Sequence, residues 1–284
     1  MADLKVSVAG VEFHNPLIAA SGTFGFGREY AEFYPLSALG GISSKGITLK
    51  ARPGNPAPRI AEAPGGMLNA VGLQNPGVDH FIEKDLPWLR EQGVTIIANI
   101  AGNTPEDYCA MAEKLNDTDI DMIEMNISCP NVKQGGVQFG TSCAGVEDIT
   151  KAVRAHCKKP LMVKLSPNVT DISEIALAAE SAGADAVSMI NTLTGMRIDI
   201  NTKRPIIHNN TGGFSGPALL PIAVRMVWQT YQKVKIPIVG LGGISTWQDA
   251  VEMLLAGATA LQIGTVLFTD PYAPVKITEG LTNY

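Results

Sequence analysis

The sequence has no apolar run of the ~18 residues that a membrane-spanning helix needs, and its start lacks the basic segment and apolar stretch of a secretory leader. Lysine and arginine are scattered along the chain instead of forming basic runs, and the formal net charge is −5. Binding to nucleic acid usually depends on a basic patch. We therefore expect a cytoplasmic protein that binds neither membranes nor nucleic acid.

The sequence also lacks the common metal and dinucleotide motifs. Its four cysteines, Cys109, Cys129, Cys143 and Cys157, form no C-x-x-C pair, and its four histidines are isolated from one another. The glycine-rich stretch 22–27 does not have the spacing of a G-x-G-x-x-G motif. The chain is therefore predicted to hold no metal ion and no iron–sulfur cluster, and to lack a dinucleotide-binding fold.

What the chain does contain is a repeated alternation of short apolar runs and amphipathic segments. Its 284 residues, 45% of them apolar, suffice for one large core. Eight runs are candidate strands: Leu17–Ala20, Gly41–Lys45, Thr95–Asn99, Met122–Asn126, Leu161–Lys164, Ala186–Ile190, Ile236–Val239 and Ala260–Ile263. Helices are expected over Asp107–Leu115, Val146–Cys157, Ile172–Ala182, Leu219–Val234 and Thr246–Ala256. Eight such units predict an α/β fold, a (β/α)8 TIM barrel.

Three segments outside this alternation complete the predicted architecture. Residues 4–13 are expected to form a small β-hairpin that closes the bottom of the barrel. The segments 48–88 and 192–216 are long and rich in Gly, Pro and Asn, which favours ordered active-site loops over the barrel mouth. Residues 1–284 are expected to form a single domain, and the short last helix after Pro271 suggests a truncated C-terminus.

Polar side chains stand at the ends of six predicted strands. They are Ser21, Lys45, Asn99, Asn126, Lys164 and Asn191. Because TIM-barrel active sites lie at the carboxyl ends of the strands, these side chains are expected around one mouth. A single lysine at such a place is often only a solvated rim charge. The six residues together favour a functional site.

The last two strands are followed by glycines, in segments 240–245 and 264–265. Glycine lets backbone N–H groups come close to an anion, and the helix that begins near Ser245 points its positive end to the same place. The loops after strands seven and eight are also the usual phosphate site of this fold. The sequence therefore predicts a phosphorylated ligand, either a substrate or a cofactor.

The stretch Asn126–Asn131 follows the fourth strand directly and places amide side chains around Cys129. Amides can bind the polar edge of a planar heterocycle, and a thiolate beside them can remove a proton from it. A buried structural cysteine, in a loop held by its own asparagines, fits the same residues. Both interpretations stay open on these residues alone.

Taken together, these motifs resemble the class 1 dihydroorotate dehydrogenases, flavin enzymes of pyrimidine biosynthesis, over residues 15–276. The segments that carry the resemblance are Ser44–Gly46, Asn69–Gly77, Asn126–Asn131, Val163–Asn168, Gly212–Gly216 and the two terminal glycine segments. At Ala70, Val71 and Gln74 the residue types resemble those of the 1B branch. The class 2 enzymes differ, because they have a serine at the position of Cys129 and an N-terminal extension.

The resemblance implies FMN as the cofactor of this chain. The positions that match the family's phosphate site are Gly216, Gly242, Gly243, Gly264 and Thr265. Those that match its sites for the ribityl chain and ring are Ser21, Lys45, Gly46, Asn99, Asn126, Lys164 and Ile190. By the same resemblance, Lys164 stabilises the negative charge that the reduced ring develops.

The resemblance also implies dihydroorotate as the substrate and orotate as the product. The implied substrate-binding residues are Lys45, Asn69, Ala70, Val71, Gly72, Leu73, Asn126, Asn131, Asn191 and Thr192. Cys129 is the implied catalytic residue, a base that removes a proton from substrate C5 while a hydride leaves C6 for the flavin.

A 1B enzyme works with a partner subunit that holds FAD and a 2Fe–2S cluster and passes electrons to NAD. The resemblance thus predicts a heterotetramer built on a homodimer. Three other functions are open at this stage. They are a fumarate-dependent 1A enzyme without the second subunit, a Schiff-base aldolase that uses Lys164, and a ligand-binding barrel that regulates a partner.

Overall fold

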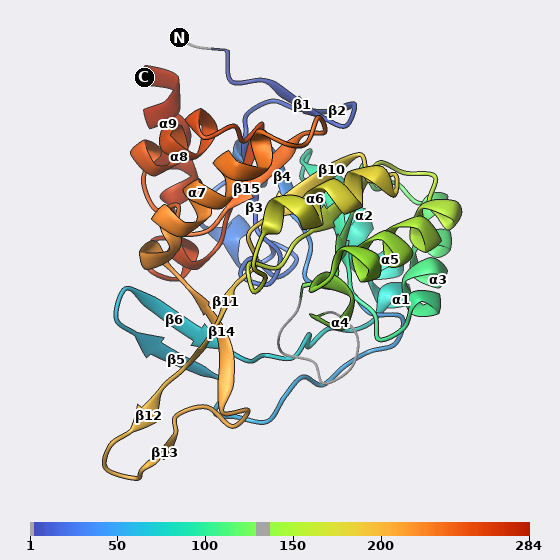
Figure 1. Cartoon of the computed structure of the whole chain (residues 1–284). Coiled ribbons are helices and arrows are strands. Elements are labelled where there is room, and N and C mark those ends of the chain that lie inside the picture. The colour runs from blue at the N-terminus through green and yellow to red at the C-terminus, as the bar shows by residue number, and fades with distance from the viewer. Residues whose placement is uncertain (1–2, 129–136) are drawn as a thin grey trace.

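In the computed structural model, which describes residues 3–128 and 137–284, eight parallel strands close into a barrel (Figure 1). They are β3 (Leu17–Ala19), β4 (Gly41–Ser43), β7 (Thr95–Ile100), β8 (Met122–Asn126), β9 (Leu161–Lys164), β10 (Ala186–Met189), β15 (Ile238–Leu241) and β16 (Ala260–Ile263). Each strand pairs with the next barrel strand along the chain, and β16 pairs with β3. The predicted TIM barrel is confirmed.

One strand begins later than predicted. The run Ile236–Val239 was expected to form the seventh strand, but β15 covers Ile238–Leu241. Pro237 explains the shift, since proline has no N–H for the ladder and is disfavoured inside a central strand. The chain therefore enters the barrel only after this proline.

The predicted N-terminal hairpin is present at the bottom of the barrel. Strands β1 (Val6–Val8) and β2 (Val11–Phe13) pair antiparallel, and Ala9 and Gly10 form the turn with positive φ angles of 53° and 80°. Two positive φ values in succession match the twist of a tight hairpin. Val8 and Phe13 pack against the inward side chains at the starts of the strands, which are Ile18, Ile97, Met122, Met162, Ala186, Val239 and Ala260. The hairpin thus plugs the amino-terminal end of the barrel.

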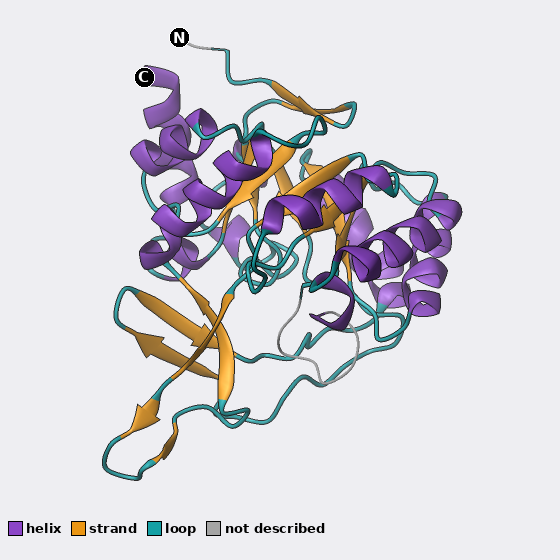
Figure 2. Ribbon diagram, viewed as in Figure 1, coloured by secondary structure: helices purple, strands orange, loops and turns teal. Residues whose placement is uncertain are grey.

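Helices surround the barrel on its outside (Figure 2). They are α1 (Val78–His80), α2 (Leu86–Glu91), α3 (Pro105–Asn116), α4 (Val137–Gly140), α5 (Cys143–His156), α6 (Ile172–Ser181), α7 (Leu220–Tyr231), α8 (Trp247–Leu255) and α9 (Ala273–Asn283). Short 3-10 turns cover Tyr30–Glu32, Leu36–Ala38, Pro217–Leu219 and Thr265–Phe268. Within the described ranges, no helix is both long enough and apolar enough to cross a membrane.

The boundaries of two predicted helices follow from their capping residues. The side chain of Asp171 accepts a hydrogen bond from the Ser173 N–H at the start of α6. Thr246 and Asp249 form a reciprocal capping box at the start of α8. Gly183 and Gly257 have positive φ angles of 97° and 114° just after these helices, where residues other than glycine are strained. Both helices are confirmed.

The segment 48–88, expected to be a loop throughout, is helical from Val78 onward. A π-helical turn over Phe81–Asp85 joins α1 to α2. Pro87 follows this π-helical turn and lies in the first turn of α2. The Leu86 N–H still donates to the Phe81 carbonyl within the π-helical turn, and Pro87, which has no N–H to donate, follows directly after it. The predicted mouth segment therefore ends at Gly77.

The two long segments after β4 and β10 form a second sheet at the end of the barrel opposite the hairpin (Figure 1). Its strands are β5 (Ile60–Ala63), β6 (Gly66–Asn69), β11 (Leu193–Met196) and β14 (Thr211–Ser215), with β14 pairing both β11 and β6. The short pair β12 (Ile198–Asp199) and β13 (Arg204–Pro205) extends from it. A Cβ atom at Gly66 would lie only 2.1 Å from the carbonyl oxygen of Ser215, so this pairing needs glycine.

The plug predicts a stability effect at Phe13, which is 1% exposed. Phe13→Ala should lower the free energy of unfolding by ~3–5 kcal/mol, because it leaves a cavity at the bottom of the barrel. Urea denaturation measures this loss. The matched control is Ile200→Ala, since Ile200 is 84% exposed and its removal should change stability by no more than ~0.5 kcal/mol. Equal losses for the two variants would contradict the plug.

Candidate active site

A cleft opens at the carboxyl ends of the barrel strands, between the barrel and the second sheet. Residues that follow β3, β4, β10, β15 and β16 line it, together with residues of β6 and β14. Its space is ≈ 1270 Å³ when the open mouth is included. Small-molecule pockets take ~300–1,000 Å³. The cleft therefore has room for a ligand of mononucleotide size.

Most of the residues predicted for a site lie in the wall of this cleft. They are Ser21, Lys45, Gly46, Asn69, Val71, Gly72, Leu73, Asn126, Lys164, Ile190, Asn191, Thr192, Gly216, Gly242, Gly243, Gly264 and Thr265. They come from nine separate stretches of the chain, which only the closed barrel and the second sheet bring together.

Two predicted residues that the structure describes, Ala70 and Asn99, do not line the cleft. Ala70 is fully buried, and its backbone N–H donates to the carbonyl of Arg59. Asn99 is also fully buried and lies behind the wall. Cys129 and Asn131 lie outside the described residues, as does the rest of the range 129–136.

A cradle of glycines forms one end of the cleft. Gly216, Gly242 and Gly243 have positive φ angles of 129°, 125° and 81°. A Cβ atom at Gly243 would lie 2.4 Å from the backbone nitrogen of Leu220, at the start of α7. The loop after β15 therefore packs directly against the amino-terminal end of a helix, which is the arrangement that favours bound anions.

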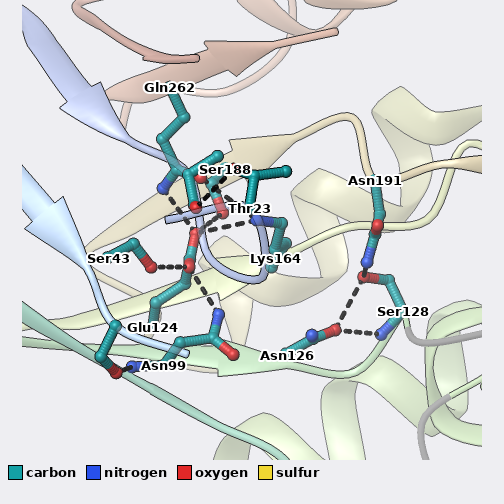
Figure 3. Close-up of polar contacts among 12 residues, drawn as sticks. Thr23, Ser43, Asn99, Glu124, Asn126, Ser128, Lys164, Ser188, Asn191 and Gln262 are labelled. Atoms are coloured by element: carbon teal, nitrogen blue, oxygen red, sulfur yellow. Dashed lines mark hydrogen bonds and ion pairs between the residues drawn. The ribbon is translucent and has the colours of Figure 1, made fainter. Parts of the chain in front are cut away.

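A fully buried carboxylate, Glu124 on β8, lies behind the wall of the cleft (Figure 3). Its Oε2 accepts hydrogen bonds from Ser43 Oγ at 2.5 Å and Asn99 Nδ2 at 2.6 Å. Its Oε1 accepts from Ser188 Oγ and Gln262 Nε2, both at 2.7 Å.

Lys164 completes this cluster from the end of β9. Its Nζ lies 3.7 Å from Glu124 Oε1 and donates to Gln262 Oε1 at 3.1 Å. The lysine side chain is 4% exposed, so the ion pair is shielded from solvent. Lys164 and Gln262 both line the cleft, whereas Glu124 does not.

The pKa of Glu124 lies below its ordinary value of 4.5, although burial alone would raise it. The positive charge of Lys164 and the hydrogen bonds from Ser43, Ser188 and Gln262 outweigh the desolvation of the carboxylate. Glu124 is therefore ionised at neutral pH and forms a salt bridge with the ammonium group of Lys164.

The predicted site did not include Glu124, Ser188 or Gln262, but the alternation of the strands contains a signal for them. Each stands two residues after a side chain that packs against the hairpin plug, which are Met122, Ala186 and Ala260. Residues two apart on a strand face the same side. Polar residues at these positions must therefore point into the barrel, just below the mouth.

A second set of hydrogen bonds orients the amides at the ends of β8 and β10 (Figure 3). Asn191 Nδ2 donates to Ser128 Oγ at 2.7 Å, and Ser128 Oγ donates to Asn126 Oδ1 at 3.0 Å. The Thr192 N–H donates to Asn191 Oδ1 at 2.8 Å. Because the Oδ1 of Asn126 is engaged by Ser128, its Nδ2 is the atom left to donate into the cleft.

The cleft has the composition of a site for a phosphorylated, polar ligand. Two lysines, Lys45 and Lys164, and a row of amides line it beside the glycine cradle. Among the residues described, no three His, Cys, Asp or Glu side chains group together in a way that could hold a metal ion. The fold and the cleft together are typical of a TIM-barrel enzyme that acts on a small molecule.

Comparison with known proteins identifies the family. Residues 3–284 match the family model of dihydroorotate dehydrogenase. The chain belongs to this family, and its resemblance to the 1B branch is confirmed by relatives named dihydroorotate dehydrogenase B (NAD(+)), catalytic subunit.

Three of these relatives show how far the similarity extends. The protein of Alkaliphilus metalliredigens is 57% identical over 99% of this chain and 93% of the relative. That of Bacteroides thetaiotaomicron is 56% identical over 100% and 94%. That of Petrotoga mobilis is 53% identical over 100% and 95%. The similarity therefore covers the barrel, the second sheet and every segment of the cleft.

The lowered pKa of Glu124 predicts how stability changes with pH. Because the pKa is lower in the folded state than in the unfolded state, the ion pair contributes stability above pH 4.5, and this contribution is lost as the pH falls through the folded pKa. Glu124→Gln should therefore lower stability at pH 7 by ~3–5 kcal/mol, because it leaves Lys164 buried without its partner. It should also lose less stability than the wild type on acidification.

Urea denaturation between pH 3 and pH 8 tests this expectation. The control is Glu12→Gln, since Glu12 is exposed and its variant should follow the wild-type curve. If Glu124→Gln loses as much stability on acidification as the wild type, Glu124 does not titrate as described.

Proposed function

We propose that this chain is the catalytic subunit of an NAD-linked dihydroorotate dehydrogenase. It oxidises (S)-dihydroorotate to orotate with FMN in the de novo synthesis of UMP. The observation that carries the proposal is the 53–57% identity to such catalytic subunits over 99–100% of the chain. The lysines, amides and glycine cradle of one cleft support it.

The residues of the cleft fit FMN in two respects. First, the glycine cradle leaves no room for side chains and presents backbone at the place where a 5′-phosphate would bind. Second, Asn99 Oδ1 is buried without a hydrogen-bond partner among the described residues, and a Cβ atom at Gly46 would approach it to 3.2 Å. An unpaired buried acceptor is costly, so a donor from a ligand over Gly46 would stabilise the site.

When bound, FMN supplies the acceptor for the hydride, a chemistry that no side chain provides. In this proposal Gly216, Gly242, Gly243, Gly264 and Thr265 hold its phosphate. Ser21, Lys45, Gly46, Asn99, Asn126, Lys164 and Ile190 hold the ribityl chain and the ring. Lys164 places a fixed positive charge beside the ring, and its Glu124 partner keeps it oriented.

The substrate would bind over the ring, against the loop of residues 69–73 and the amides at the ends of β8 and β10. Lys45 pairs with the substrate carboxylate, together with the backbone from Ala70 to Leu73. Because Ala70 is buried and tied to Arg59, its contribution is to fix the neighbouring Val71, Gly72 and Leu73, which line the cleft. Asn69, Asn126, Asn131, Asn191 and Thr192 bind the polar edges of the pyrimidine ring.

Cys129 is the proposed base, which takes the proton from substrate C5 as the hydride leaves C6. It follows Ser128 directly in the sequence, and Ser128 is hydrogen-bonded to both Asn126 and Asn191. The amides that would bind the pyrimidine ring therefore also fix the residue that directly precedes the base. A thiol with the reference pKa of ~8.5 is mostly protonated at neutral pH, so turnover should rise with pH.

A Schiff-base aldolase is less well supported by the geometry. Such an enzyme needs a neutral lysine amine as the nucleophile. The nitrogen of Lys164 is instead engaged behind the wall of the cleft, where it lies 3.7 Å from Glu124 Oε1 and donates to Gln262 Oε1 at 3.1 Å. A yellow purified protein that turns over dihydroorotate with a dye as the acceptor would exclude the aldolase and a non-catalytic ligand-binding barrel together.

Replacing the base tests the proposed chemistry. Cys129→Ala should keep FMN bound but slow its reduction by dihydroorotate by ~10²–10⁴-fold, the usual effect of losing a general base. Anaerobic stopped-flow absorbance measures this rate. Cys143→Ala is the matched control, because Cys143 is an exposed free cysteine and its variant should react at the wild-type rate. Wild-type flavin reduction in Cys129→Ala would remove this residue from the mechanism.

The electron acceptor separates the 1B proposal from the fumarate-dependent alternative. We propose a partner subunit with FAD and a 2Fe–2S cluster, in a heterotetramer built on a homodimer of this chain. Purification of the chain from its native cell should then bring down an iron–sulfur flavoprotein, and the complex should reduce NAD. Fumarate-dependent turnover by the isolated chain, without NAD reduction by any complex, would favour the 1A alternative.

A further inference from the structure

Glu124 is a buried charge to which the proposed chemistry gives no step. Its two oxygens accept hydrogen bonds from four side chains, those of Ser43, Asn99, Ser188 and Gln262. Burial of a carboxylate carries a large desolvation penalty, and apolar side chains of similar volume often stabilise a core as well or better. Stability alone therefore does not explain a glutamate at this place.

The hydrogen bonds make Glu124 the residue that orients Gln262. A glutamine side chain has a donor and an acceptor end, and Gln262 Nε2 donates to the carboxylate at 2.7 Å. Its Oε1 must then point the other way, where it accepts from Lys164 Nζ at 3.1 Å. With a neutral partner at position 124, the amide could turn and present its NH₂ group to the ammonium.

The same carboxylate also acts on Lys164 directly. The distance of 3.7 Å between Glu124 Oε1 and Lys164 Nζ is that of an ion pair, and both side chains are shielded from water. The negative charge of Glu124, behind the wall of the cleft, therefore partly offsets the positive charge of Lys164 in the wall. Because solvent screens these charges only weakly, a ligand in the cleft is exposed to the electrostatic potential of both.

We propose that Glu124 is a positioning residue that sets how strongly Lys164 stabilises negative charge on the bound cofactor, and thereby sets the midpoint potential of FMN in this protein. The inference rests on the proposed function, since it requires FMN in the cleft. It assigns Glu124 no contact with the cofactor or the substrate, because the residue lies behind Lys164 and Gln262.

The test is a cycle of two substitutions, with the midpoint potential of FMN bound to the full chain as the readout. Glu124→Gln removes the negative charge at nearly constant volume. The equilibrium constant for FMN reduction should rise at least about tenfold, which for a two-electron couple is ~30 mV. Lys164→Gln should shift the potential in the opposite direction, because it removes the positive charge from the wall.

The double variant distinguishes an action through Lys164 from a direct effect on the flavin. Without Lys164, burial favours the protonated form of Glu124. The charge of Lys164 is the largest of the effects that lower the pKa of this carboxylate. Glu124→Gln should then change the potential little in the Lys164→Gln background. An equal shift in both backgrounds, or no shift in the wild-type background, would overturn the inference.

Asp121→Asn is the control for general loosening of the barrel. Asp121 precedes β8 by one residue, at the other end of the strand, where it accepts from the Ile96 N–H and pairs with Arg90, both at 2.7 Å. This variant should lose stability and keep the wild-type potential. A shift as large as that of Glu124→Gln would show that the potential follows stability, and would overturn the inference.

Two further outcomes are informative. If Glu124→Gln does not fold, Lys164→Gln is compared with the double variant, which has no unpaired buried charge and should fold. Equal potentials in these two would support the inference, and a double variant that also fails to fold would assign Glu124 a purely structural role.

If the wild type binds no FMN, both this inference and the proposed function are wrong. If the wild type binds FMN and Glu124→Gln leaves the midpoint potential unchanged, the inference is wrong and the proposed function stands.

Discussion

The interior of a closed barrel leaves no water to satisfy a polar group, and this constraint accounts for most of the site. At the amino-terminal end, the inward side chains are apolar and pack against the hairpin plug. The next layer of inward side chains, toward the carboxyl ends of the strands, is polar. Nearly every polar side-chain atom of this layer has a partner within it, and its members are Ser43, Asn99, Glu124, Lys164, Ser188 and Gln262. Glu124 is the centre of this layer, since five of its neighbours depend on one carboxylate.

This layer links the fold to the function. Lys164 and Gln262 form part of the wall of the cleft, and their positions follow from their contacts with Glu124. Asn99 Oδ1, which has no hydrogen-bond partner among the described residues, lies behind the wall next to Gly46. A site built in this way is preorganised, because its charges are fixed before a ligand enters and need no rearrangement when charge develops. The second sheet then covers the cleft from the other side.

Much of the fold follows from the sequence, because its signals are local. The eight apolar runs, the capping residues Asp171 and Thr246, and the hairpin around Gly10 each depend on neighbours along the chain. The second sheet could not be predicted in this way. It pairs residues 67–69 with residues 213–215, and two glycine-rich segments separated by so many residues carry no local sign of their pairing. The helical stretch from Val78 to Glu91 was not predicted, because the segment 48–88 was assigned to the barrel mouth on its length and its Gly, Pro and Asn content.

The site was predictable to a similar degree. The strand-end lysines and amides could be placed from barrel geometry alone, and the glycine cradle from the usual phosphate site of this fold. Glu124 was missed because a lone acidic residue in an apolar strand, Met122–Asn126, has no local partner. Its partners come from five other strands, and only their shared inward register brings them together.

The most direct test of the account is a crystal structure of this chain with FMN and orotate bound. The account predicts the phosphate at Gly216, Gly242 and Gly243, with the Lys164 ammonium within hydrogen-bonding distance of the flavin ring and still paired with Glu124. A phosphate bound elsewhere, or a ring that does not approach Lys164, would contradict it.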